Sequence, residues 1–237
     1  MKIKRKVFNT KAEIAPYLAE ELISLTSDNR LIYIALSGGS TPQVIFDILA
    51  NDFKNKIKWE NLRFFWVDER CVPPNDNESN YRMTKNHLFS KLSIDEEHIF
   101  RIKGELNPMD ALTEYIEEIN SHVPKKNGLP YFDLTILGMG DDGHTASIFP
   151  HEIELWNSNN ICALGHHPLT SQTRITLTGK VINNSNKIIF LVTGSNKADK
   201  VKAIFKKNSE VKKYPAALAD TSKSIWLMDK EAAKLIV

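Results

Sequence analysis

The chain has 237 residues, of which 42% are apolar and 25% charged, and 31 Lys and Arg against 29 Asp and Glu leave a net charge of +2. This composition excludes a disordered protein, and its near-neutral charge gives no sign of a nucleic-acid partner. The longest apolar run, residues 31–36, is much shorter than the roughly 20 residues that cross a bilayer. Two cysteines and a basic N-terminus without an apolar signal core indicate a cytoplasmic protein.

Short apolar segments at regular intervals predict the strands of a buried sheet. Residues 2–8 alternate polar and apolar side chains, whereas 31–36 and 62–67 are almost wholly apolar. In chain order, the expected strands cover residues 2–8, 31–36, 62–67, 132–137, 174–178, 187–193 and 224–228.

Helical patterns fill the gaps between these strands. Ile14, Leu18, Leu22 and Leu25 share one face of the first helix, which is expected to follow a capping box. In chain order, helices are expected after the capping box Thr10–Glu13, from Pro42, over residues 79–89, from Asn107-Pro108 and after Asn196. Residues 231–236 close the chain.

Strands that alternate with helices at this spacing indicate an α/β fold, with a mostly parallel, Rossmann-like sheet and helices on both faces. No linker, low-complexity tract or shift in composition divides the chain. We therefore expect one domain over residues 1–237. Residues 150–172 show no clear period and have no assigned element.

Three polar or glycine-rich loops come directly after predicted strands, at residues 37–41, 68–70 and 138–144. Ligands bind beyond the carboxyl ends of the strands in open parallel sheets, so these loops are expected to meet at one site. Each loop alone would be weak evidence, and their convergence is the main indication of function.

The first loop consists of Ser37, Gly38, Gly39, Ser40 and Thr41 and leads straight into a helix. Successive backbone N–H groups and the positive end of a helix form a binding site for phosphate. The loop is not a Walker A motif, because it contains no Gly-Lys-Ser/Thr. A plain turn between strand and helix is the alternative.

The segment Gly138-Met-Gly-Asp-Asp-Gly143 matches the pattern G-x-G-x-x-G after a strand. A nicotinamide cofactor is nevertheless not expected, because Asp141 and Asp142 would place two carboxylates where a pyrophosphate must lie. No long amphipathic helix follows, and no obvious ribose-binding acid stands about 20 residues further on.

His144 directly follows this loop, and imidazole suits proton transfer near neutral pH. Asp142 is close enough in sequence to orient the ring. A structural histidine beside a capping Asp is the alternative, but the glycine turn at a strand end favours catalysis. A metal site made of Asp142, His144, His151, His166 and His167 would match no standard zinc spacing, so no metal is expected.

Basic side chains accompany the expected strand ends. Arg70 ends an Asp-Glu-Arg run and suits bidentate contact with phosphate or carboxylate, although a surface ion pair would explain this run by itself. Arg174 and Lys197 lie near later strand ends, and each could hold an anion. The lysines of residues 197–213 indicate a solvated helix face, and without interleaved aromatic residues they do not indicate nucleic-acid binding.

Five segments together carry a resemblance to a known family. They are Leu36-Ser-Gly-Gly-Ser-Thr-Pro42, Val67-Asp-Glu-Arg70 with Ser79-Asn-Tyr81, Leu137-Gly-Met-Gly-Asp-Asp-Gly-His-Thr-Ala-Ser-Ile-Phe-Pro150, Arg174-Ile-Thr-Leu-Thr178 and Thr193-Gly-Ser-Asn-Lys197. In this order, and over nearly the whole chain, they resemble the 6-phosphogluconolactonase family. That family belongs with the glucosamine-6-phosphate deaminases and is similar in fold to ribose-5-phosphate isomerase.

A sugar-phosphate deaminase or isomerase of the same group is the main alternative. The deaminases carry a motif similar to Gly-His-Ile-Ala-Phe-Asn-Glu-Pro, in which the Glu works with the His in ring opening. This chain has Phe149 at the matching position. A phenyl ring transfers no proton, whereas water attack on a lactone needs no second acid, so Phe149 favours the lactonase. A non-enzymatic sugar-phosphate sensor is the third hypothesis, and no helix-turn-helix segment precedes the domain to support it.

The resemblance implies hydrolysis of 6-phosphoglucono-δ-lactone to 6-phosphogluconate in the oxidative pentose phosphate pathway, with no metal or redox cofactor. His144 would deprotonate the attacking water. Asp68 would hold sugar hydroxyls or orient that water, and Asp142 would also lie beside the lactone. Arg70 or a backbone N–H would stabilise the oxyanion.

The resemblance also implies how the substrate is held. The loop of residues 37–41, together with Arg174 and Lys197, would bind the substrate phosphate. The expected partner is this sugar phosphate alone, with no nucleic acid and no membrane. The chain is expected to be a monomer or a weak homo-oligomer.

Overall fold

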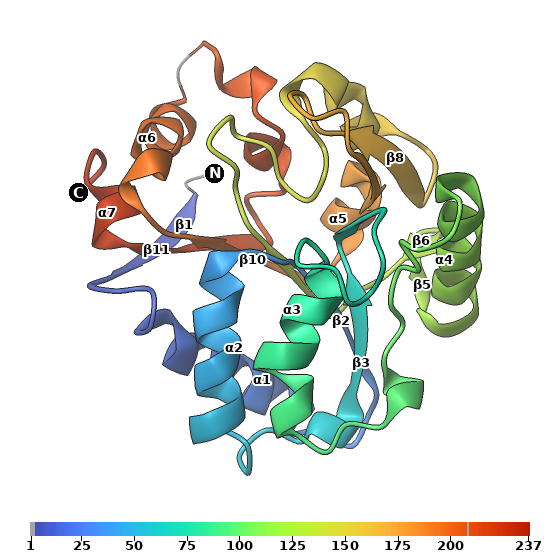
Figure 1. Cartoon of the computed structure of the whole chain (residues 1–237). Coiled ribbons are helices and arrows are strands. Elements are labelled where there is room, and N and C mark those ends of the chain that lie inside the picture. The colour runs from blue at the N-terminus through green and yellow to red at the C-terminus, as the bar shows by residue number, and fades with distance from the viewer. Residues whose placement is uncertain (1–2, 208) are drawn as a thin grey trace.

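The computed structural model describes residues 3–207 and 209–237 (Figure 1). Its centre is a six-stranded sheet in the order β1-β11-β10-β7-β2-β3, in which all neighbouring strands are parallel. The strands are β1 (Lys4–Phe8), β2 (Ile32–Leu36), β3 (Leu62–Trp66), β7 (Leu134–Leu137), β10 (Lys187–Val192) and β11 (Ser224–Asp229). The predicted α/β fold with a mostly parallel sheet is therefore confirmed.

Helices flank this sheet. All four residues of β7 are buried, as are five of the six in β10, so both faces of the sheet are covered. The helices are α1 (Ile14–Thr26), α2 (Ser40–Asp52), α3 (Asn80–His87), α4 (Pro108–His122), α5 (Gly179–Asn184), α6 (Ala198–Lys206) and α7 (Lys230–Ala233). Within the described residues, no helix has the length and hydropathy needed to cross a membrane.

A second, three-stranded sheet corrects one prediction. The residues 68–70, expected as a loop, form strand β4 (Asp68–Arg70), which pairs antiparallel with β9 (Thr173–Leu177). β8 (Cys162–His166) completes this sheet, and β5 (Lys125–Lys126) and β6 (Leu129–Pro130) form a separate hairpin. A three-residue polar strand has no visible period, and its partner lies about 100 residues away, so local pattern could not reveal it.

The ends of several elements also differ from the predictions. The strand predicted over residues 2–8 begins at Lys4, and Lys2 lies outside the described residues. The predicted capping box forms in part. The Thr10 hydroxyl accepts the N–H of Glu13 at 3.4 Å, as expected. The reciprocal bond is wrong, because the Glu13 carboxylate accepts the N–H of Asn9 at 3.0 Å and not that of Thr10. The last helix is the short α7.

The unassigned stretch of residues 150–172 also has a structure. It contains β8, which belongs to the small sheet, and the 3₁₀ helix η4 (Pro150–Asn157). This 3₁₀ segment has three residues per turn, so it shows neither the α-helical nor the strand period that the sequence was searched for.

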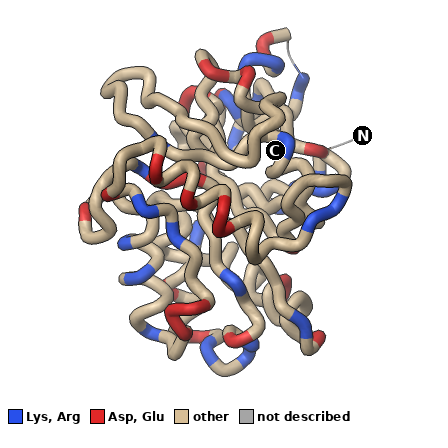
Figure 2. Tube along the Cα trace, turned by 90° about the vertical axis from the view of Figure 1, so that its right-hand side faces the viewer, with Lys and Arg blue, Asp and Glu red and all other residues tan. Residues whose placement is uncertain are grey.

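Charge is distributed over the surface in small groups. Figure 2 shows Lys and Arg interspersed with Asp and Glu along the trace, with a row of acidic residues on the side turned toward the viewer, where α4 lies. The net charge of +2 is thus the small difference between positive and negative residues that are interspersed along the chain.

The Tyr115 hydroxyl completes the outer edge of β3. The fully buried phenol donates to the backbone oxygen of Trp66 at 2.7 Å and accepts the N–H of the same residue at 2.8 Å. Since β3 is an edge strand, Tyr115→Phe leaves both backbone groups of Trp66 unpaired. We expect the free energy of unfolding in urea to fall by about 2–4 kcal/mol. Tyr33→Phe, which removes a phenol that bonds no described residue, should change it by less than about 0.5 kcal/mol.

Candidate active site

A cavity of about 1080 Å³ opens at the carboxyl ends of the central strands. Its lining includes parts of the loops after β2, β7 and β10 together with residues of the small sheet. All eleven site residues proposed from the sequence line this cavity: Ser37, Gly38, Gly39, Ser40, Thr41, Asp68, Arg70, Asp142, His144, Arg174 and Lys197. The three segments predicted as loops thus meet at one place, although residues 68–70 are a strand.

The loop of residues 37–41 joins β2 to the N-terminus of α2. Gly39 has φ +106°, a backbone conformation that L-residues with side chains rarely adopt, and it directly precedes the first helical residue. No described side chain caps this helix, so its first backbone N–H groups are open to a ligand. The Ser37 hydroxyl donates to Ile136 O at 2.5 Å and ties the loop to β7.

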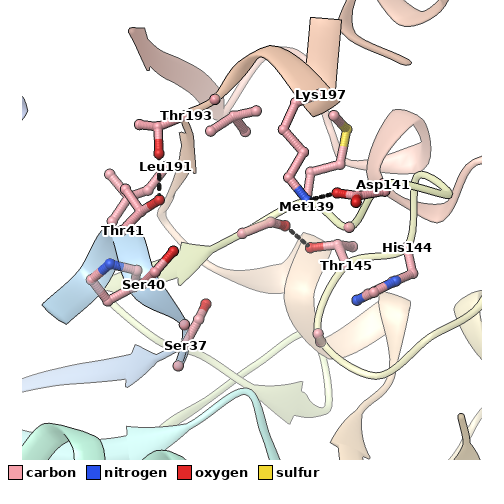
Figure 3. A pocket seen from close by; sticks show the side chains of 18 of the residues that line it. Ser37, Ser40, Thr41, Met139, Asp141, His144, Thr145, Leu191, Thr193 and Lys197 are labelled. Carbon is pink, nitrogen blue, oxygen red and sulfur yellow. Dashed lines mark hydrogen bonds and ion pairs between the residues drawn. The ribbon is translucent and has the colours of Figure 1, made fainter. Parts of the chain in front are cut away.

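Figure 3 shows how the walls of the cavity face each other. Ser40 and Thr41 lie on one side, and His144 and Lys197 lie on the other. Thr41 bonds Thr193, beyond β10, through their hydroxyls at 2.6 Å, which fixes the first turn of α2 against the neighbouring strand end. A ligand in the cavity can therefore touch the helix N-terminus and the histidine together.

His144 is held by Asp142 on its own loop. Asp142 Oδ1 lies 2.6 Å from His144 Nδ1 and also accepts the backbone N–H of His144 at 3.0 Å. Burial by itself would raise the pKa of Asp142, but the hydrogen bonds and charge of His144 outweigh it and lower that pKa to about 2. An ionised Asp142 fixes the proton on Nδ1, so Nε2 is available as a base.

A close approach of Gly140 to this ring explains why a glycine stands there. A Cβ at Gly140 would lie 2.2 Å from the His144 ring, a distance that real atoms do not tolerate. Gly140 therefore leaves room for the imidazole ring of His144.

Asp68 is almost fully buried and accepts hydrogen bonds on both carboxylate oxygens. Ser147 Oγ donates to Oδ2 at 2.5 Å, and Asn80 Nδ2 donates to Oδ1 at 3.3 Å and to the backbone oxygen at 2.9 Å. Neither Ser147 nor Asn80 was assigned a role from the sequence. Both belong to the motifs that carry the family resemblance. Only folding brings them to Asp68, because Asn80 lies 12 positions and Ser147 lies 79 positions further along the chain.

Two arginines lie side by side across the small sheet. Arg174 was expected near a strand end, but it is the second residue of β9, and the antiparallel register places it opposite Arg70. Burial and the nearby positive charge of Arg70 both lower the pKa of Arg174, because each disfavours its charged form. Arg70 donates to Glu78 O at 2.6 Å and Arg174 Nε to Gln172 at 3.2 Å, so neither pairs with a described carboxylate.

Lys197 reaches the cavity from the 3₁₀ turn that follows β10. It forms an ion pair with Asp141, the neighbour of Asp142 (Figure 3). This pair holds the ammonium group over the loop that carries His144, and Lys197 lowers the pKa of Asp141. The cavity is thus lined by four lysine and arginine side chains, Lys11, Arg70, Arg174 and Lys197, which can contact an anionic ligand.

Comparison with known proteins gives this site its context. Residues 8–227 match the protein family described as glucosamine-6-phosphate isomerases/6-phosphogluconolactonase. The chain belongs to this family.

Relatives with high coverage bear the lactonase name. The 6-phosphogluconolactonase of Treponema pallidum is 44% identical over 85% of this chain and 84% of that protein. The 6-phosphogluconolactonase of Haemophilus influenzae is 40% identical over 97% of this chain and 98% of that protein. The solved structure of the 6-phosphogluconolactonase from Trypanosoma brucei has 27% identity and a TM-score of 0.85, covering 100% of this chain and 99% of that one. The resemblance drawn from the motifs is therefore confirmed.

Phe149, the residue that the motif comparison sets against the acid of the deaminases, packs beside His144. It is fully buried, and its ring centroid lies 4.7 Å from that of His144 and 5.5 Å from that of His167. The Arg174 guanidinium lies over the same ring at 5.6 Å. Phe149 therefore supports His144 and Arg174 by packing and supplies no second proton donor.

The histidines considered for a metal site lie apart from the cluster of possible ligands in the structure. Within residues 3–207 and 209–237, the ligating atoms that cluster are those of Asp95, Glu97 and His98, none of which lines the cavity. His166 instead bonds Glu152 at 2.8 Å.

The lowered pKa of Asp142 predicts an acid-dependent loss of stability. A carboxyl group whose pKa falls from 3.8 to about 2 on folding stabilises the native state above the higher value, and this contribution disappears as the pH falls toward 2. We therefore expect the free energy of unfolding to drop less steeply between about pH 4 and pH 2 in Asp142→Asn than in the wild type. Urea unfolding across that range tests this. Asp199→Asn, which alters an exposed carboxylate on α6, should keep the wild-type slope.

Proposed function

We propose that this chain is a 6-phosphogluconolactonase, which hydrolyses 6-phosphoglucono-δ-lactone to 6-phosphogluconate in the oxidative pentose phosphate pathway. The observation that carries the proposal is the pairing of an oriented histidine with an open helix N-terminus in one cavity. The first group suits removal of a proton from water and the second suits a phosphate. Relatives of that name, aligned over nearly the whole chain, support the same activity.

His144 acts as the general base. Its Nε2 takes a proton from a water molecule whose oxygen attacks the lactone carbonyl, while Asp142 holds the Nδ1 proton. When the tetrahedral intermediate collapses, the bond between the carbonyl carbon and the ring oxygen breaks. The ring oxygen takes up the proton from His144 and becomes a hydroxyl, and the product carboxylic acid ionises. General-base assistance of this kind contributes about 10²–10⁴-fold.

The charged residues contact different parts of the substrate. The loop of residues 37–41 and Lys197 hold the phosphate, and Arg174 contributes a further positive charge to it. Arg70 stabilises the negative charge that develops on the carbonyl oxygen. Asp68, fixed by its two hydrogen bonds, accepts from a sugar hydroxyl or from the attacking water.

The broader setting forms part of the same proposal. Residues 1–237 work as one domain, as a monomer or weak homo-oligomer in the cytoplasm, on a sugar phosphate and without nucleic acid, membrane or metal. Activity that survives dialysis against a chelator, and light scattering of the purified protein, test the metal and the assembly.

A coupled assay tests the activity. Glucose-6-phosphate dehydrogenase generates the lactone in situ, and 6-phosphogluconate dehydrogenase reports the product as NADPH. We expect the chain to accelerate product formation well above spontaneous hydrolysis. Ammonia release from glucosamine 6-phosphate, measured beside it, separates the deaminase. Ammonia release without lactone hydrolysis would overturn the proposal.

A further inference from the structure

Glu69 is a buried acid that the lactonase chemistry does not use. It stands in β4 between Asp68 and Arg70, and strand geometry turns its side chain to the opposite face. Both neighbours line the cavity, whereas Glu69 does not, and it is only 2% exposed. Within the described residues it forms no ion pair.

Four hydrogen bonds saturate this carboxylate. Oε1 accepts the backbone N–H groups of Arg70 and Asn80, each at 2.8 Å. Oε2 accepts the N–H of Tyr81 at 2.8 Å and the Ser79 hydroxyl at 3.0 Å. An ionised carboxylate is the side chain that only accepts and can accept four such bonds, so neither Gln nor Ala can replace it.

These bonds connect the N-terminal turn of α3 to β4. Three of the four donors belong to that turn, namely Ser79, Asn80 and Tyr81. The side chain of Asn80 in turn donates to Asp68. The fourth donor, Arg70, has its backbone fixed by the same carboxylate that fixes α3.

The phosphate-binding loop is part of the same arrangement. A Cβ at Gly38 would lie 1.8 Å from Asn80 Oδ1, so the side chain of Asn80 packs directly against Gly38. A shift in the position of Asn80 would reach the carboxylate of Asp68 and the loop of residues 37–41 together.

We propose that Glu69 is a positioning residue for the lactone hydrolysis, which places Asp68 and Arg70 by fixing the N-terminus of α3 against β4. This rests on the proposed lactonase function. Glu69 does not touch the substrate, and it acts through Asn80 and through the backbone of Arg70.

Glu69→Gln tests the proposal with a change of only one atom. The new amide group would turn hydrogen-bond donors toward groups that also donate, so the turn must shift. A displacement of about 1 Å in a reacting group can lower a rate by about 10²-fold. We expect kcat of the coupled reaction to fall by about that factor, with a smaller change in KM, because Lys197 and the N-terminus of α2 still hold the phosphate.

Asp133→Asn is a matched control. Asp133 is also a buried carboxylate that accepts a backbone N–H, that of Tyr33 at 2.9 Å, and it forms an ion pair with Arg30 besides. It does not line the cavity and directly precedes β7. It should lose stability in urea and keep the wild-type kcat and KM. A similar fall in kcat in both variants would mean that Glu69 serves stability alone, and would overturn the proposal.

Asn80→Ala examines the route of the effect and also replaces Glu69→Gln if that variant does not fold. It should lower kcat by itself, and adding Glu69→Gln should lower kcat less than the two single effects combined, because both interrupt one path. Independent effects that multiply, or an unchanged kcat in Asn80→Ala, would refute the proposed route. An inactive wild type in the same assay would instead refute the lactonase function.

Discussion

His144→Ala is expected to lower kcat for lactone hydrolysis by about 10²–10⁴-fold and to leave KM nearly unchanged. In the proposed mechanism Nε2 takes part in the transition state, whereas the groups proposed to hold the phosphate lie in other parts of the cavity. Asp142 already holds the imidazole ring in position, so the base does not have to reorient during the reaction. Removing the ring therefore removes a preorganised base.

Steady-state rates in the coupled assay measure this effect. His151→Ala is the matched control, because His151 lies on the same segment of chain but does not line the cavity. The affinity of His144→Ala for 6-phosphogluconate, measured by calorimetry, should stay close to that of the wild type. Full turnover in His144→Ala would remove the assignment of this residue as the base.

Lys197→Ala is expected to lower kcat/KM for the phosphorylated lactone by about 10–100-fold, which corresponds to the loss of one charge-assisted hydrogen bond. The side chain lies at the cavity wall, and its removal also leaves the negative charge of Asp141 without its cation beside the proposed phosphate site.

A comparison of two substrates makes this prediction specific. For δ-gluconolactone, which has no phosphate, Lys197→Ala and the wild type should have similar kcat/KM. Lys202→Ala, an exposed lysine on α6, should behave as the wild type with both substrates. An equal loss with both lactones would place Lys197 away from the phosphate.

Local sequence patterns predict the central sheet well, because β2, β3 and β7 are apolar runs that lead into glycine or acidic segments. The residues of β2 and β3 differ from the predicted runs by one position at one end each. The small sheet was not predicted, since β4 is too short and polar to show a period and pairs with residues far along the chain. Tertiary pairing, which one sequence does not display, decides such strands.

The site was predicted better than its supports. Ser37–Thr41, Asp68 and His144 could be found because they follow strands, and strand ends converge in a parallel sheet. Asn80 and Glu69 could not be found in this way. The buried carboxylate of Glu69 accepts the backbone N–H groups of Asn80 and Tyr81, and such contacts leave no pattern in the sequence. The catalytic roles of His144 and Asp68 and the phosphate-binding role of Ser37–Thr41 stay predictions until the variants are measured.

Val67 joins the two sheets through its backbone. Its N–H donates to Leu36 O in the large sheet at 2.9 Å, and its carbonyl accepts Leu177 N–H of the small sheet at 2.8 Å. The next three side chains then alternate between cavity and α3. Deleting or inserting one residue here would exchange those two directions, turning Glu69 into the cavity and the groups beside it away. The number of residues between β3 and Arg70 therefore decides which side chains face the cavity, and a change by one residue is not tolerated there.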